Sequence, residues 1–99
     1  MLHIVNKSPT QARALQRCLR MAQDGHSVLL IEDAVYAATA AGALASGLDQ
    51  ALARLKVYVL QPDLEARGMA ARRIDGVAPV DYAGFVELAA AQPTCQSWL

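Results

Sequence analysis

Four short runs of branched and other apolar residues, each followed by a segment with helix-forming signals, constrain the fold of this 99-residue chain most strongly. Strands that alternate with helices are joined by right-handed crossovers, so the pattern predicts an α/β fold with parallel strands. We expect a three-layer α/β/α architecture, with a mostly parallel sheet of about four or five strands, in one domain over residues 1–99. The predicted strands are Leu2–Val5, Ser27–Ile31, Val57–Leu60 and Val77–Val80.

The first predicted helix runs from Pro9 to about Gln23. Ser8 precedes it as a candidate N-cap, and proline suits the first helical position because no amide donor is needed there. One side of this helix is apolar, whereas arginines share the opposite side at helical spacing. The apolar positions are Ala14, Leu15, Cys18, Leu19 and Ala22, and the arginines are Arg13, Arg17 and Arg20.

Capping signals predict further helical segments along the chain, each opened by a serine, an acid or a proline. The expected segments are Ala34–Ala41 with Asp33 as N-cap, a loop over Gly42–Ser46, Gly47–Arg54 opened by the capping-box pair Ser46 and Asp49, Gln61–Gly68, and a helix from the N-cap Asp81 to about Gln92. The remaining tail, Cys95–Leu99, is expected to form an edge strand or a docking tail.

The charge and hydropathy of the chain exclude several classes of function. Nine basic residues balance nine acidic ones, so no overall field favours direct binding to nucleic acid. The longest apolar tract, Ala34–Ala45, is shorter than the roughly 20 residues of a membrane span. Met1–Val5 runs directly into polar residues, unlike a signal peptide, and we therefore expect a cytoplasmic protein. The core is rich in alanine and poor in aromatics, which favours assembly with a partner.

The sequence offers no residue pattern for a cofactor or a metal. Asn6–Pro9, after the first strand, lacks the glycines of a phosphate-binding loop. The pair Glu32 and Asp33 suits a magnesium site of a receiver-like phosphoprotein, with Asp33 as acceptor, but the end of the first strand offers no further acid. The two cysteines and two histidines show no metal-ligand spacing, and both histidines are expected to be solvated or hydrogen-bonded at strand edges.

Cys18 is the candidate catalytic residue, with two interpretations. As a sulfur carrier it would react as a thiolate and hold the transferred sulfur as a persulfide, which requires exposure and a lowered pKa. The alternative is a buried small hydrophobe, and the helical pattern favours it, because Cys18 lies in the middle of the apolar face. Cys95 is expected to be accessible, but no base or cation is near it in the sequence.

Aromatic and basic residues supply the candidate interaction surfaces. Tyr36, Phe85 and Trp98 are interface candidates, although aromatic residues more often fill a core. Trp98 is the strongest of the three, because a chain-terminal segment has less fold around it to fill. The arginine stripe of the first helix suits an acidic partner surface, or is a solvated helix face.

Several short sequence blocks match one family in register over essentially the full length of the chain. Together they are more specific for that family than any single block. They are Leu2–Pro9, Leu29–Asp33, Lys56–Leu60, Asp63–Gly68, Asp81–Val86 and the ending Gln96–Leu99. In these blocks the chain resembles the DsrH/TusB family of sulfur-relay subunits. The resemblance implies a DsrE/DsrF/DsrH-type fold without a cofactor, assembled with homologous DsrE/TusD-like and DsrF/TusC-like subunits into a heterohexamer of two copies each.

The resemblance also implies a function for the assembly. Such complexes receive persulfide sulfur and pass it to a DsrC/TusE-like acceptor, for thiolation of the tRNA wobble uridine or for dissimilatory sulfur oxidation. The principal sulfur-carrying cysteine belongs to the DsrE/TusD-like partner, which implies a mainly structural and docking role for this chain. Cys18 matches a cysteine of the DsrH branch, which favours sulfur oxidation and keeps a carrier role for Cys18 as the alternative. One departure is Ala34, where the family commonly has glycine.

Overall fold

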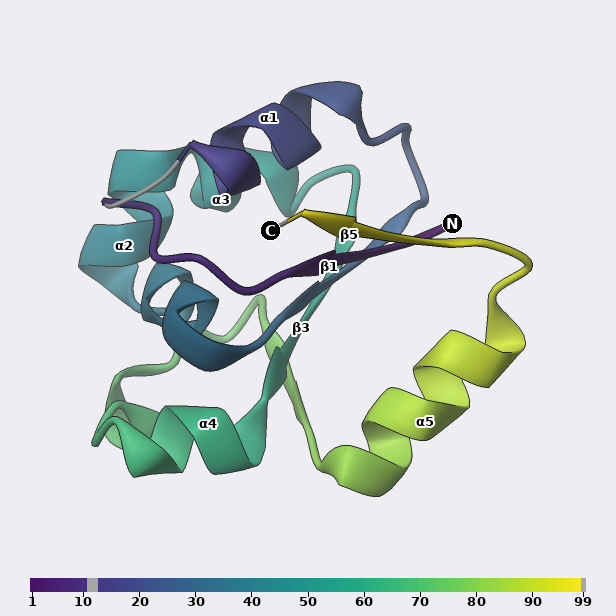
Figure 1. Ribbon diagram of the computed structural model, residues 1–99. Coiled ribbons are helices and arrows are strands. Elements are labelled where there is room, and N and C mark those ends of the chain that lie inside the picture. The colour runs from purple at the N-terminus through teal and green to yellow at the C-terminus, as the bar shows by residue number, and fades with distance from the viewer. Residues whose placement is uncertain (11–12, 99) are drawn as a thin grey trace.

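The computed structural model describes residues 1–10 and 13–98 and contains one five-stranded parallel sheet (Figure 1). The strands lie in the order β4-β3-β2-β1-β5, and every neighbouring pair is parallel. The predicted α/β class is therefore confirmed. The tail forms the edge strand β5 beside β1, and so is not a free docking tail. The strands are β1 (Leu2–Val5), β2 (Ser27–Leu30), β3 (Lys56–Leu60), β4 (Ala78–Val80) and β5 (Cys95–Trp98).

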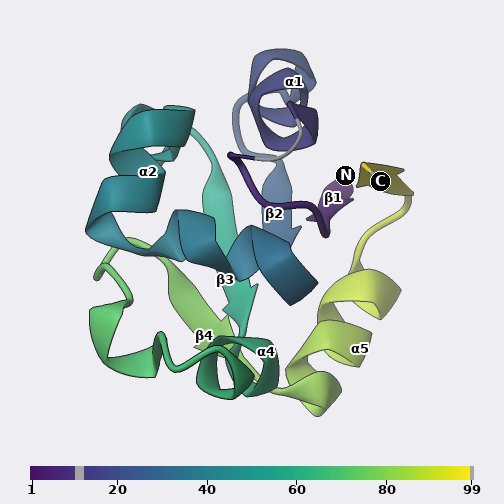
Figure 2. The same cartoon turned by 60° about the vertical axis from the view of Figure 1, so that its left-hand side comes forward.

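Helices flank both faces of the sheet, as the three-layer prediction requires (Figure 2). The α-helices are α1 (Ala14–Met21), α2 (Ala40–Ser46), α3 (Leu48–Ala51), α4 (Gln61–Ala66) and α5 (Tyr82–Ala91), and the 3-10 helices are η1 (Glu32–Ala38) and η2 (Ala70–Arg72). None of the helices among the described residues is long and apolar enough to cross a membrane.

One face of the sheet carries the main core. The register places Val5 beside Leu30 and Val28 beside Val57, and the alternating pleat directs these side chains to the same face. They join a single buried cluster with Leu15 and with residues of η1, α2, α3 and α4. This face is therefore closed by α1 and by the helices between β2 and β4.

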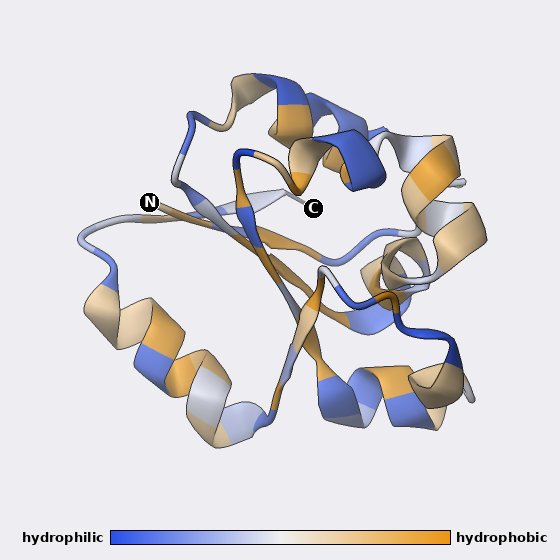
Figure 3. Ribbon diagram, turned by 180° about the vertical axis from the view of Figure 1, so that it is seen from behind, coloured by the Kyte–Doolittle hydropathy of each residue, from blue (hydrophilic) through white to orange (hydrophobic). Residues whose placement is uncertain are grey.

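The opposite face is covered by α5, which lies across the sheet from α1 and α2 (Figure 2). Leu2, Leu29 and Leu60 are buried on this face, whereas Ile4 and Tyr58 stay half-exposed. None of the ten residues of α5 is buried, although the helix is apolar along much of its length (Figure 3). The second face is thus only thinly covered in the single chain.

Two predicted helix starts, at Ser8 and at Asp33, are wrong. Ser8 does not cap α1; its Oγ accepts from the Thr10 amide at 3.3 Å in a turn, and α1 begins at Ala14. Residues 11–12 of the predicted helix lie outside the described residues. Asp33 is not an N-cap either, because the 3-10 helix η1 already includes Glu32.

The helix bounds between η1 and β3 also differ from the prediction, and the helix predicted over residues 47–54 is only the short α3. The expected loop over residues 42–46 is the helix α2, which Thr39 caps by accepting from the Gly42 amide at 3.2 Å. The predicted capping box is absent, since the Asp49 carboxylate accepts from the amide of Gln50. Gly47, with a φ of 82°, separates α2 from the short α3. The predictions for α4 and for Asp81 as the N-cap of α5 are confirmed.

Candidate functional site

The Cys18 thiol is fully buried on the inner face of α1. Its exposed fraction is 0%, and it packs in the main core with Leu15 and Leu19. Burial raises the pKa of Cys18 to about 12, because a thiolate would lose its hydration there. The predicted burial is confirmed. In this structure Cys18 lacks the exposure and the lowered pKa that a sulfur nucleophile needs.

Cys95 is exposed on the edge strand β5. Among the described residues, no three side chains of histidine, cysteine, aspartate or glutamate gather closely enough to hold a metal ion. The second cysteine therefore has no neighbouring set of metal ligands in the described part of the chain.

Sequence reasoning missed a cluster of His3, His26 and Trp98 on the face of the sheet that carries the main core. His3 Nε2 lies 3.0 Å from His26 Nδ1, and the Trp98 indole nitrogen donates to His3 Nδ1 at 3.1 Å. His3 is only 2% exposed. The parallel pairing of β1 with both β2 and β5 brings these residues together from distant positions in the sequence.

The hydrogen bonds fix the protonation of this cluster. An indole N–H can only donate, so His3 Nδ1 must accept and the proton of neutral His3 resides on Nε2. His3 then donates to His26 Nδ1, which also accepts from the Gln23 amide at 3.2 Å. Burial lowers the pKa of His3, and the neighbouring His26 and the N-terminal ammonium lower it further. Protonation of His3 at Nδ1 would break its bond to Trp98.

The lowered pKa of His3 predicts that the fold loses stability in acid. The unfolded chain protonates His3 near its ordinary pKa of 6.5, whereas the folded chain resists the proton. Stability from this group is therefore present above pH 6.5 and is lost as the pH falls through the folded-state pKa. Thermal unfolding of the wild type and His3→Gln, followed between pH 8 and pH 5 through Trp98 fluorescence, should give the steeper loss in the wild type. Equal pH dependence in both proteins would contradict this assignment.

Polar groups also meet at the carboxyl ends of β1, β2 and β3. The Glu32 amide donates to the Asp63 carboxylate at 2.6 Å, and Asn6 donates to the Glu32 carboxylate at 3.5 Å. The Asn6 side-chain oxygen is buried without a hydrogen-bond partner. Arg67 forms an ion pair with Asp33 at 2.9 Å. The acids of this edge thus bind a backbone amide and an arginine within the chain.

The interface candidates lie on three separate surfaces. Tyr36, 38% exposed, lines a hollow of about 500 Å³ between η1 and the turn at Pro9. Phe85 is half-buried on α5, where Tyr82 and Val86 are exposed. Trp98 is half-buried on β5, beside α1. The structure does not bring the three aromatic residues together.

Comparisons with known proteins identify the family of this chain. A family model described as DsrH like protein matches residues 7–94. Protein TusB of Enterobacter sp. (strain 638) is 40% identical over 98 residues, which cover 99% of this chain and 100% of that protein. Protein TusB of Pectobacterium parmentieri is 38% identical with the same coverage. The chain belongs to the DsrH/TusB family.

Solved structures place this DsrH/TusB chain in a wider fold group. The YchN protein of E. coli superimposes with a TM-score of 0.81 at 19% identity, covering 97% of each chain. A protein of unknown function from Methanobacterium thermoautotrophicum gives a TM-score of 0.72 at 13% identity, covering 97% of this chain and 95% of that one. At these identities the likeness establishes the fold alone.

Ala34, where the resemblance led us to expect glycine, is not strained in this chain. Ala34 lies fully buried within η1, and its φ is not positive. The left-handed position after β2 is instead Glu32, with a φ of 50°. The bond from the Glu32 amide to Asp63 holds this unusual backbone in place.

Proposed function

We propose that this chain is a subunit of a cytoplasmic, multi-subunit sulfur-relay complex in which its main role is structural. It completes the assembly and shapes the docking surface for a sulfur-accepting protein. Membership of the DsrH/TusB family supports the relay. The burial of Cys18, with its raised pKa, supports placing the reactive cysteine on a partner chain. In this proposal the partners are DsrE/TusD-like and DsrF/TusC-like subunits and a DsrC/TusE-like acceptor.

The observation that carries the proposal is the unburied apolar helix α5. A helix that is hydrophobic around its circumference is normally enclosed, yet no residue of α5 is buried. Tyr82 and Val86 are 62% and 66% exposed, and Phe85 is half-buried beside them. Exposed apolar surface of this kind is typical of an assembly interface. We therefore assign Tyr82, Phe85 and Val86, the α5 patch, to contact with the homologous subunits.

The names of the relatives bear on the destination of the sulfur. The relatives at 36–40% identity are named TusB, which favours thiolation of the tRNA wobble uridine over dissimilatory sulfur oxidation. Cys18 is the feature that favours the oxidation branch. Because Cys18 is buried in the core, it serves packing equally well in either branch. We therefore propose tRNA thiolation as the pathway.

A charge on the α5 patch should prevent assembly without unfolding the chain. Val86→Glu places a carboxylate where a partner would cover it, and an unpaired interfacial charge costs about 2 kcal/mol or more. We expect at least about a thirtyfold weaker complex when this variant is co-expressed with the two homologous subunits, measured by co-purification and light scattering.

Leu44→Glu is the matched control, because Leu44 is 73% exposed on α2, away from the α5 patch. It should assemble as the wild type does. Circular dichroism should report the native fold for both variants. Full assembly of Val86→Glu would contradict the α5 interface, and a wild-type chain that ignores both homologous subunits would contradict the proposed function itself.

A further inference from the structure

The outward face of α1 presents three arginines that have no acidic partner among the described residues. Arg13, Arg17 and Arg20 are all exposed. The ion pairs within residues 1–10 and 13–98 involve Arg54 and Arg67 alone. Like charges three and four residues apart on a helix repel one another, by about 0.2–0.5 kcal/mol per pair. An acidic ligand on this face would relieve that repulsion.

The charges of the chain are segregated along its sequence. Residues 1–23 contain four cations and no acid, which gives a charge of +4. Residues 24–99 contain the nine acids and the remaining five cations, which gives −4. The neutral total therefore conceals a basic N-terminal segment, whose arginines lie on the surface of α1. This local charge is the electrostatic complement of an acidic partner.

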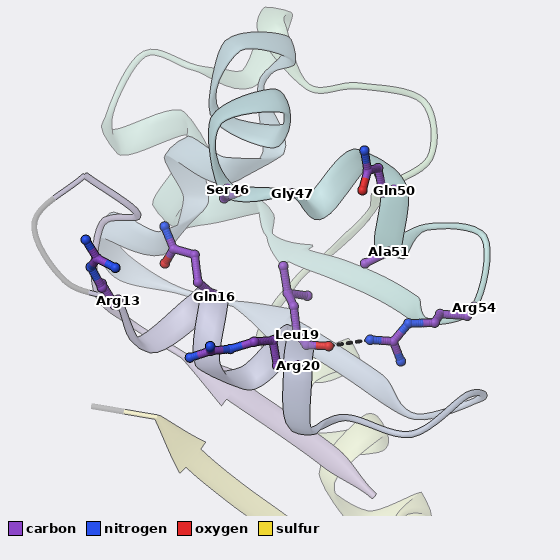
Figure 4. Close-up of a pocket in the computed structure, with 9 residues that line it drawn as sticks. All are labelled: Arg13, Gln16, Leu19, Arg20, Ser46, Gly47, Gln50, Ala51 and Arg54. Carbon is purple, nitrogen blue, oxygen red and sulfur yellow. Dashed lines mark hydrogen bonds between the residues drawn. The ribbon is translucent and has the colours of Figure 1, made fainter.

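A hollow of about 450 Å³ lies on one side of these arginines, between α1 and α3 (Figure 4). Arg13, Gln16 and Arg20 line it from α1. Arg54 lies at its far end, where its guanidinium donates to the Leu19 and Ala22 carbonyls and is not free for a ligand. The Gln16 side-chain oxygen accepts no hydrogen bond from the described residues, but it is buried and a ligand cannot reach it. The hollow thus presents two cations, Arg13 and Arg20.

A second hollow, of about 540 Å³, lies on the other side of the arginines. Arg17, Arg20, Met21 and Trp98 line it. Met21 is 69% exposed although it is a large apolar residue. Arginine, methionine and tryptophan are the residue types enriched at the centres of protein interfaces. This second hollow therefore offers an apolar contact surface beside the basic one.

We propose that this α1 surface, formed by Arg13, Gln16, Arg17, Arg20, Met21 and Trp98, binds an acidic segment of a partner protein. Carboxylates of the segment pair with the arginines, and an apolar side chain packs on Met21 and Trp98. Arg13 and Arg20 lie seven residues apart, which is about 10 Å along the helix and more than one small oxyanion can bridge. The surface and its occupant do not depend on sulfur transfer or on the α5 patch.

A fluorescein-labelled peptide with alternating glutamates and one central leucine tests this proposal on the isolated chain by fluorescence anisotropy. We expect saturable binding at 50 mM NaCl that weakens at 300 mM NaCl. The double variant Arg13→Gln/Arg20→Gln should bind at least tenfold more weakly. A peptide with serine in place of leucine should also bind more weakly, because it cannot use the apolar hollow.

The matched control is Lys56→Gln/Arg72→Gln, which removes the same charge from exposed positions outside α1. It should keep wild-type affinity, and an equal loss in this control would overturn the proposal as non-specific attraction. Inorganic phosphate that binds as tightly as the peptide would identify a small-anion site and overturn it. Light scattering that shows a salt-sensitive dimer, lost in the arginine variant, would make a second copy the occupant and overturn it as well.

Discussion

The Cys18 thiol is expected to resist alkylation in the native chain at least about a thousandfold more than an ordinary thiol. Its pKa is raised from 9.0 to about 12, which lowers the reactive thiolate fraction at neutral pH by about three powers of ten. Its exposed fraction of 0% slows any reagent further. Iodoacetamide at pH 7.4 should therefore add one group to the native chain, at Cys95, and two groups in guanidinium chloride.

Two single-cysteine variants separate the contributions in intact-mass spectrometry. Cys95→Ser should remain unmodified while folded, and Cys18→Ala should react as the wild type does at Cys95. The same variants answer the rival function, in which Cys18 carries persulfide. After incubation with a polysulfide donor, a folded Cys95→Ser chain should gain no sulfur. A gain of one sulfur in the Cys95→Ser chain that is lost in the double variant Cys18→Ser/Cys95→Ser would establish the carrier function and remove the main support for a purely structural role.

The strands were predictable because their signal is local. Leu2–Val5 and Ser27–Leu30 are short, largely apolar runs. Burial of such a run requires only a sheet that is covered by helices. The burial of Cys18 follows in the same way from the helical spacing of its apolar neighbours. The Asp81 cap was also predictable, since its carboxylate accepts from the Gly84 amide only three residues away, at 2.7 Å.

The rest depended on contacts between distant segments. Ser8 carries the same capping signal as Asp81, but its hydroxyl is used by the nearer Thr10 amide. His3, His26 and Trp98 form one cluster only because β1 lies between β2 and β5, and strand order has no local signature. The position of a histidine at the centre of the first strand, facing the core, was the one signal that could have suggested a buried partner.

Gly42 was predicted to be a loop residue, but it lies inside α2. Steric crowding explains why this helical position is a glycine. A side chain at this position would meet the backbone of η1. An ideal Cβ would overlap the Tyr36 carbonyl oxygen and lie 2.9 Å from its carbon and 3.0 Å from the Ala37 Cα. The contacted atoms of Tyr36 and Ala37 belong to the backbone of η1, which cannot withdraw as a flexible side chain can. Glycine at this position therefore permits the close approach of η1 and α2.

Gly42→Ala is expected to destabilise the fold by about 1–3 kcal/mol, as overpacking of a close contact does. Alanine is intrinsically about 1 kcal/mol better than glycine in a helix, so a net loss would show that the clash outweighs the gain in helix propensity. For a chain of this size the loss corresponds to a fall in Tm of about 5–20 °C in thermal unfolding followed by circular dichroism.

Gly84→Ala in α5 is the matched control, since its Cβ would lie 3.1 Å from the Val80 Cβ, a tight contact but not an overlap with a backbone atom. A shift of a few tenths of an ångström relieves such a contact, so this variant should stay within about 1 kcal/mol of the wild type. If Gly42→Ala were as stable as the wild type, η1 and α2 would be free to separate. At this contact the Tyr36 carbonyl accepts from the Thr39 hydroxyl at 2.8 Å. Tyr36 would then not be held in a fixed position for contact with a partner.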